Sequence, residues 1–153
     1  MGQQQLLLLV LGIIIVGLAT VYGITMFDLN HTKSNADVMI NEALRMATDI
    51  QAWAVKPNMI GGLASGETMA DVTFTDIGYP NSSGTYNSPN GDFVLSTLLG
   101  SACDTPVIPS GKTVLIYING TNDDTGNSIC VAIAGTEVAD IGTDAKYGSG
   151  ITS

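Results

Sequence analysis

Residues 6–27 read LLLLVLGIIIVGLATVYGITMF, and this stretch decides how the rest of the chain is organised. It holds no charged side chain, and the first one in the sequence is Asp28. At a helical rise of about 1.5 Å per residue, a run of this length can cross the apolar core of a bilayer. A soluble domain does not expose such a run, so the sequence predicts an apolar partner for it, either lipid or other helices.

The flanks of this run are unusual for a signal peptide or an anchor. The preceding residues, MGQQQ, contain no Lys or Arg, and the first basic residue is Lys33. A signal peptide has a basic n-region and an apolar region of only about 7–15 residues. A basic leader that preceded Met1 and was removed would explain the missing charges.

Glycines interrupt the run at positions 12, 17 and 23. Small residues let helices approach closely in an apolar environment. Glycine is also simply common in membrane helices, so close helix packing and a plain anchor both remain open here.

Residues 28–57 change to an amphipathic pattern, which predicts that the helix continues and packs one side on a domain. The polar residues Asp37, Glu42, Arg45, Asp49 and Gln51 fall largely outside the apolar stripe, and Pro57 ends the helix. We expect one helix over residues 2–55, either continuous or loosened between Gly23 and Ser34. The stripe predicted to pack on the domain comprises Ala36, Met39, Ile40, Ala43, Met46, Ala47, Ile50 and Trp53.

The remaining residues, 58–153, have the pattern of a small antiparallel sheet. Alternation and β-branched residues predict strands at 71–77, 92–99, 112–119 and 128–134, with 136–141 either extending the sheet or forming a further strand. Residues 58–70 and 79–91 are expected to be loop and turn, and 142–153 a polar tail. The predicted fold is α+β, with a long N-terminal helix packed on about four antiparallel strands.

Charge and cysteine content indicate the compartment. The chain has 14 acidic and 5 basic side chains, all from residue 28 onward. An acidic surface argues against nucleic-acid binding and suits an exported domain. Cys103 and Cys130 are the only cysteines, which predicts one disulfide in an exported domain; the alternative is two unpaired buried thiols in a reducing compartment.

The sequence carries little that points to catalysis, so we predict no enzyme, no catalytic residue and no cofactor. The only histidine is His31, and no Cys/His spacing typical of a metal site occurs. Asp123 and Asp124 could offer oxygens to Ca²⁺ within NGTNDDTGN (119–127), but the pattern favours a plain hairpin turn. Of the glycosylation sequons, those at Asn81 and Asn119 are candidates for modification, and Asn81 lies in the more exposed turn.

The layout as a whole resembles a type IV pilin or pseudopilin: an apolar N-terminal run, an amphipathic continuation ending near residue 56, a small sheet and a late cysteine pair. Members of that family usually carry Glu at the fifth position of the mature chain. Here that position holds Gln5, or Leu7 if cleavage followed Gly2. In the family this carboxylate is taken to pair with a neighbour's N-terminal amine. Gln5 could accept a hydrogen bond from such an amine but could not neutralise it.

The resemblance implies three parts: 1–27 in the membrane before assembly and in the filament core after it, 28–57 as the helical continuation, and 58–153 as the outer domain. The expected assembly residues are Met1, Gln5, Leu6, Leu9, Gly12, Ile13, Val16, Gly17, Thr20, Gly23 and Phe27. Expected partners are other copies of the chain, the inner-membrane assembly machinery and a leader peptidase.

The function expected from this resemblance is that of a structural subunit of a surface filament, inserted in the inner membrane before assembly. The sequence does not choose between adhesion and motility. Two alternatives stay open: a minor pseudopilin of a secretion system, and a membrane-tethered extracellular binding module whose apolar run is a plain anchor.

Overall fold

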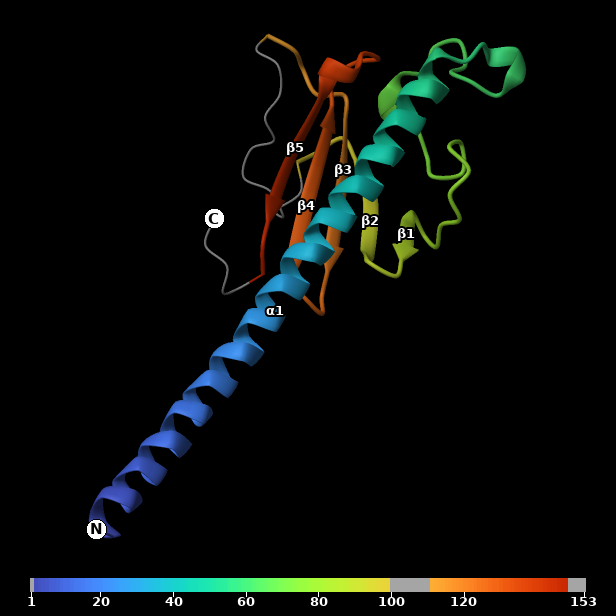
Figure 1. The fold of residues 1–153 in the computed structure, drawn as a ribbon. Coiled ribbons are helices and arrows are strands. Elements are labelled where there is room, and N and C mark those ends of the chain that lie inside the picture. Colours follow the sequence, from blue (N-terminus) through green and yellow to red (C-terminus); the bar gives the residue numbers. More distant parts are fainter. Residues whose placement is uncertain (1, 100–110, 149–153) are drawn as a thin grey trace.

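A single helix, α1 (Gly2–Val55), runs through the first third of the chain without interruption. The computed structural model describes residues 2–99 and 111–148. Figure 1 shows that only the second half of α1 lies against the sheet, while its N-terminal half projects away from the domain. Of the two predicted forms of this helix, the structure has the continuous one. The helix stops just before Pro57, whose ring cannot continue it.

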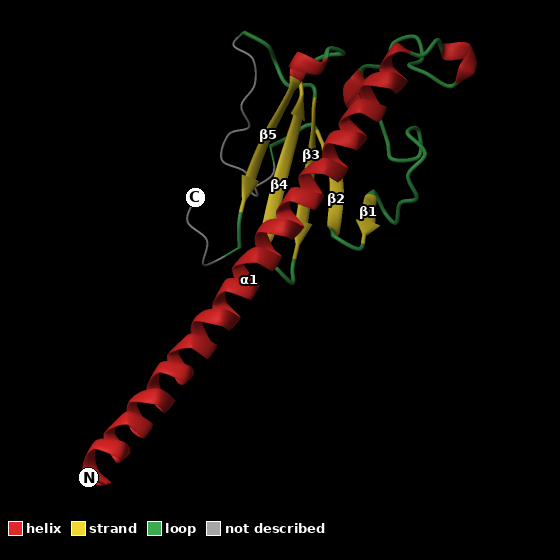
Figure 2. Ribbon diagram, in the orientation of Figure 1, coloured by secondary structure: helices red, strands yellow, loops and turns green. Residues whose placement is uncertain are grey.

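The rest of the domain is a five-stranded antiparallel sheet in which each strand pairs with the next one along the chain (Figure 2). The predicted α+β class is therefore confirmed, with five strands in place of about four. The strands are β1 (Thr85–Ser88), β2 (Gly91–Ser96), β3 (Ile116–Asn122), β4 (Asn127–Ile133) and β5 (Ile141–Lys146).

The core lies between α1 and one face of this sheet. Ile129, Val131 and Ile133 alternate along β4 and are fully buried beneath the helix, and Ile118 lies beside them on β3. Successive side chains of a strand point to opposite faces, so this alternation selects the side chains that meet the helix. The apolar contact surface extends onto β2, where Phe93 is also fully buried.

The prediction of a strand at 71–77 is wrong. Met69–Asp71 form a short 3₁₀ helix, η2, and the following residues form turns. Val72 and Phe74 are buried as their alternation suggested, but side-chain bonds close the backbone locally. The Asp76 carboxylate accepts hydrogen bonds from the backbone N–H and the hydroxyl of Thr73. Thr and Asp side chains that bond nearby backbone compete with a strand ladder, and here the turn forms instead.

Two further strands lie where the sequence predicted turn or tail. β1 falls inside the segment 79–91, after a tight turn in which Ser83 and Gly84 have φ values of 53° and 84°. The further strand expected at 136–141 lies later in the chain: Val138–Asp140 form the 3₁₀ helix η3, and β5 occupies the first residues of the predicted polar tail. Both are edge strands, and polar residues are typical of edges because they discourage pairing with other chains.

The loop after the helix begins with a third 3₁₀ turn, η1 (Asn58–Ile60), which ends at Gly61 with a φ of 83°. The three predicted strands 92–99, 112–119 and 128–134 correspond to β2, β3 and β4 with shifted ends. β3 runs to Asn122, so the connection to β4 is a turn of only four residues.

Candidate assembly surface

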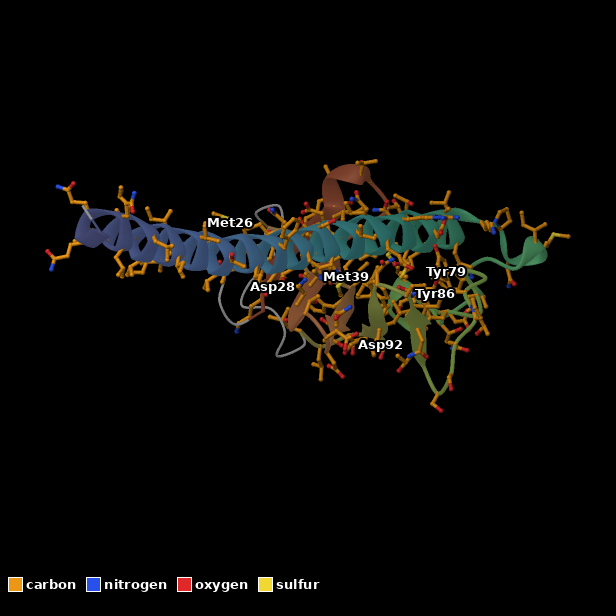
Figure 3. The ribbon with its side chains drawn as sticks, turned by 60° about the horizontal axis from the view of Figure 1, so that its bottom comes forward. Met26, Asp28, Met39, Tyr79, Tyr86 and Asp92 are labelled. Atoms are coloured by element: carbon orange, nitrogen blue, oxygen red, sulfur yellow. The ribbon has the colours of Figure 1, made fainter. Side chains whose placement is uncertain are left out.

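The projecting half of α1 is an apolar surface that no part of the described domain covers. Leu9 is 63% exposed, Val16 65% and Phe27 79%. Figure 3 shows side chains standing out around this segment as far as Met26 and Asp28, whereas Met39 lies between the helix and the sheet. So much exposed apolar area on one helix is costly in water and favours an apolar partner.

Two hydroxyl groups in this segment are bonded within the helix itself. Thr20 Oγ1 donates to the backbone carbonyl of Val16 at 2.8 Å, and Thr25 Oγ1 donates to that of Tyr22 at 3.0 Å. A hydroxyl whose proton is already donated can enter lipid or a helix bundle without losing a hydrogen bond. Neither of these two threonine hydroxyls therefore requires water.

Of the predicted assembly residues, ten lie on this exposed helical segment and Met1 falls outside the described residues. A Cβ built on Gly12, Gly17 or Gly23 would meet no atom within 4 Å. Within the single chain, nothing in the described structure requires glycine at these positions.

By length and composition, α1 qualifies as a membrane span. An 18-residue window in it has a mean hydropathy of 2.7, and none of that window is buried. The N-terminal helix is thus compatible with a membrane anchor or with a signal sequence.

The predicted packing stripe lies on the side of α1 that faces the sheet. Ile40 is only partly buried and packs against the edge of the core. The other seven residues of the stripe are buried, namely Ala36, Met39, Ala43, Met46, Ala47, Ile50 and Trp53. The second half of α1 is thus covered by its own domain, whereas the first half is not.

Sequence reasoning missed a buried polar residue on the helix. Gln51 was assigned to the polar side, yet it is only 6% exposed. Its side-chain amide donates to the backbone carbonyls of Gly135 and Glu137 at 2.9 and 2.8 Å. Both partners lie more than 80 residues away in the sequence, so no local pattern signals this contact.

A second unpredicted contact joins Tyr79 to the helix. The Tyr79 hydroxyl donates to Asp49 Oδ2 at 2.9 Å. Burial of the ring, followed by the bond to Asp49 and the negative charge of that carboxylate, raises the pKa of Tyr79 from 10.0 to about 12.

This raised pKa predicts a loss of stability at alkaline pH. The unfolded chain releases the Tyr79 proton near pH 10 and the folded chain only near 12, so the contribution is complete below pH 10 and lost between these values. Tyr79→Phe should lower the unfolding free energy at pH 7 by about 1 kcal/mol and flatten its alkaline decline. Urea unfolding at pH 7, 9 and 11 measures both. Tyr117→Phe, on the other face of the sheet, is the control; equal alkaline slopes in the two variants would contradict the assignment.

The two candidate calcium ligands lie in the turn between β3 and β4. Asp123 and Asp124, together with Asp92, line a hollow of about 210 Å³ beside the β3–β4 turn. Among residues 2–99 and 111–148, no three His, Cys, Asp or Glu side chains come together as a metal site would require. The geometry supports the hairpin interpretation of the 119–127 segment.

The sequon residues and cysteines differ in exposure. Asn81 is exposed just before the turn that leads into β1, whereas Asn119 is half-buried on β3. Cys130 is fully buried in β4 and is not a free thiol. Cys103 lies outside the described residues, so the pairing of these two cysteines stays a prediction.

Comparison with known proteins finds no matching family model, no matching curated protein and no matching solved structure.

Proposed function

We propose that this chain is the structural subunit of an extracellular helical filament similar to a type IV pilus, polymerising through residues 2–27. The observation that carries this proposal is the division of α1 into an exposed apolar half and a half covered by the sheet. The apolar half would sit in the inner membrane before assembly and be buried among copies of itself afterwards. The acidic domain would form the outer surface.

The rival proposal is a membrane-tethered binding module. The same apolar half favours it, since a helix of this length and composition can serve as an anchor. The rival differs in what it requires of the second half of α1. An anchor needs only a connection to its domain, whereas a filament subunit benefits from a rigid helix that holds the domain at a fixed place beside the core. The unbroken helix over 54 residues supports the filament proposal.

The decisive experiment is electron microscopy of material sheared from cells that express the chain with its leader and assembly apparatus. Mass spectrometry of the same material would identify the subunit. Filaments that contain this chain support the proposal. Membrane-bound monomer alone, in cells whose apparatus assembles another subunit, would favour the tethered module.

Leucine substitutions at Gly12 and Gly17 distinguish a filament subunit from a membrane-tethered module. In the single chain a Cβ at either position meets no atom within 4 Å, and leucine is a better helix former than glycine by about 0.5–1 kcal/mol. An anchor would therefore be unaffected. In a filament the bulkier residues would hold neighbouring helices apart, so we expect filament yield to fall roughly tenfold while membrane insertion stays normal.

The control for these variants is Ala139→Leu, which places the same leucine side chain at an exposed position on η3. Filament yield is quantified relative to the membrane-inserted subunit in each strain. Undiminished yield with leucine at both glycine positions would argue against close helix packing.

A further inference from the structure

The contacts between α1 and the domain end within a short stretch of the helix. Ala36 is the first fully buried residue of α1; Asn35, the residue before it, and Thr32, one turn earlier, are half-buried. Upstream of Thr32 nearly every helical residue is exposed. Residues 32–36 are therefore the last part of α1 that the described domain contacts before the helix projects away from it.

Asn127, the first residue of β4, contacts the helix at this point. Its side chain is 1% exposed, and its amide donates to the backbone carbonyl of Thr32 at 2.7 Å and to Asn35 Oδ1 at 3.0 Å. Its own Oδ1 accepts a hydrogen bond from the backbone N–H of Gly148 at 3.1 Å. Both donors and the acceptor of this buried amide are therefore used.

Asn35 connects the helix to two turns of the sheet. Its Oδ1 also accepts from Thr125 Oγ1 at 3.0 Å, in the turn between β3 and β4. Its Nδ2 donates to the backbone carbonyl of Asn90 at 2.9 Å, in the turn between β1 and β2. Asn122 Nδ2 donates to the same carbonyl at 2.6 Å, so the two turns are also tied to each other. Figure 1 shows the β3–β4 turn beside α1 where the helix emerges.

These contacts are the hydrogen bonds nearest the point where the helix leaves the domain; farther along, Glu42, Asp49 and Gln51 are also hydrogen-bonded to the domain. Between Ala36 and Trp53 the helix meets the sheet mainly through apolar side chains, and apolar burial has no directional preference. Hydrogen bonds require a narrow range of distance and angle, and a buried amide left without partners is costly. Apolar packing therefore holds the helix on the sheet, while the amide contacts restrict its tilt.

We infer that Asn127 and Asn35 fix the direction in which α1 leaves the domain, and thereby set how the domain is placed on the filament. The second half of this statement rests on the proposed function; the first half does not. Asn127 acts here as a positioning residue, because it touches the helix near its exit and not the assembly surface itself.

The test is Asn127→Asp in the full chain in detergent micelles. The carboxylate keeps the size of the side chain but removes both donors and faces the Thr32 carbonyl and Asn35 Oδ1 with negative charge. Spin labels at Met26→Cys and Val138→Cys report the distance between the projecting helix and the domain. We expect a narrow distance distribution in the wild type and a broadened one in Asn127→Asp.

Two further variants keep the test interpretable. Asn35→Ala removes the helix side of the contact without altering the sheet, so it should broaden the same distribution even if Asn127→Asp fails to fold. Asn58→Asp makes the same chemical change at an exposed position beyond the other end of α1 and should leave the distribution narrow.

The outcomes separate this inference from the proposed function. A distribution as narrow in Asn35→Ala and in a folded Asn127→Asp as in the wild type would overturn the helix-direction role. Broadening with roughly tenfold lower filament yield supports the whole inference, and broadening with normal yield overturns its link to assembly. If the wild type forms no filaments at all, the proposed function fails, while the distance measurement still decides the role of Asn127 and Asn35.

Discussion

Replacing Val16 with arginine is expected to abolish filament formation while leaving the domain as stable as in the wild type. Val16 is 65% exposed on the projecting half of α1, so the substitution disturbs no contact within the described domain. A charged side chain at the centre of an apolar helix costs about 3 kcal/mol in a bilayer, which corresponds to roughly a hundredfold in an equilibrium. In a filament every copy would carry the same cost.

Val138→Arg is the matched control for this experiment. Val138 is 82% exposed on η3 and lies in the outer domain, where an added charge remains in water. Filament yield, membrane-bound subunit and the urea midpoint of the domain are measured in both variants. Filaments of normal length and number from Val16→Arg would be incompatible with an assembly surface formed by residues 2–27.

Phe93→Ala is expected to be the most damaging change to the domain itself, with a loss of about 3–5 kcal/mol in unfolding free energy. The Phe93 ring is fully buried and pairs across the sheet with Gly120, which leaves room for it. A Cβ at Gly120 would come within 2.8 Å of this ring. The ring also stacks on Tyr86, with centroids 6.1 Å apart. Its removal would leave a cavity bounded by rigid strands.

Urea unfolding of the full chain in detergent measures this effect. The neighbouring Val94→Ala provides the comparison, because Val94 is 40% exposed on the other face of β2 and its truncation should change the free energy by only about 0.5 kcal/mol. Since a typical domain is stable by about 5–15 kcal/mol, Phe93→Ala removes a large share. Similar losses in the two variants would show that Phe93 is not central to the core.

The helix and the central strands could be predicted because their signals are local. An uncharged run followed by an apolar stripe at helical spacing indicates α1, and β-branched residues indicate β3 and β4. The strand predicted at 71–77 failed because alternation reports only which side chains are buried. Whether the backbone is extended depended on the bonds between Thr73 and Asp76, which the alternation does not contain.

Contacts between distant polar residues could not be predicted. Asn127 and Asn35 read as turn and helix-surface residues, and their partnership appears only when the β3–β4 turn reaches the helix. Gln51 is similar, since its two acceptors are carbonyls from a distant loop. A further strand after β4 was expected too early, at 136–141, because the polar composition of β5, GTDAK after Ile141, suits an edge but resembles a tail.

The pairing of each strand with its successor has a consequence for how the protein forms. Each hairpin joins neighbouring segments of chain, so the sheet needs few long loop closures, and such topologies fold quickly. The long-range step is the docking of the sheet onto α1, which is synthesised first and whose apolar half can already be held in lipid. The helix is then already in place when the sheet docks onto it. A chain truncated before β4 would lack the strand that lies beneath the helix, and the apolar stripe of α1 would be left exposed.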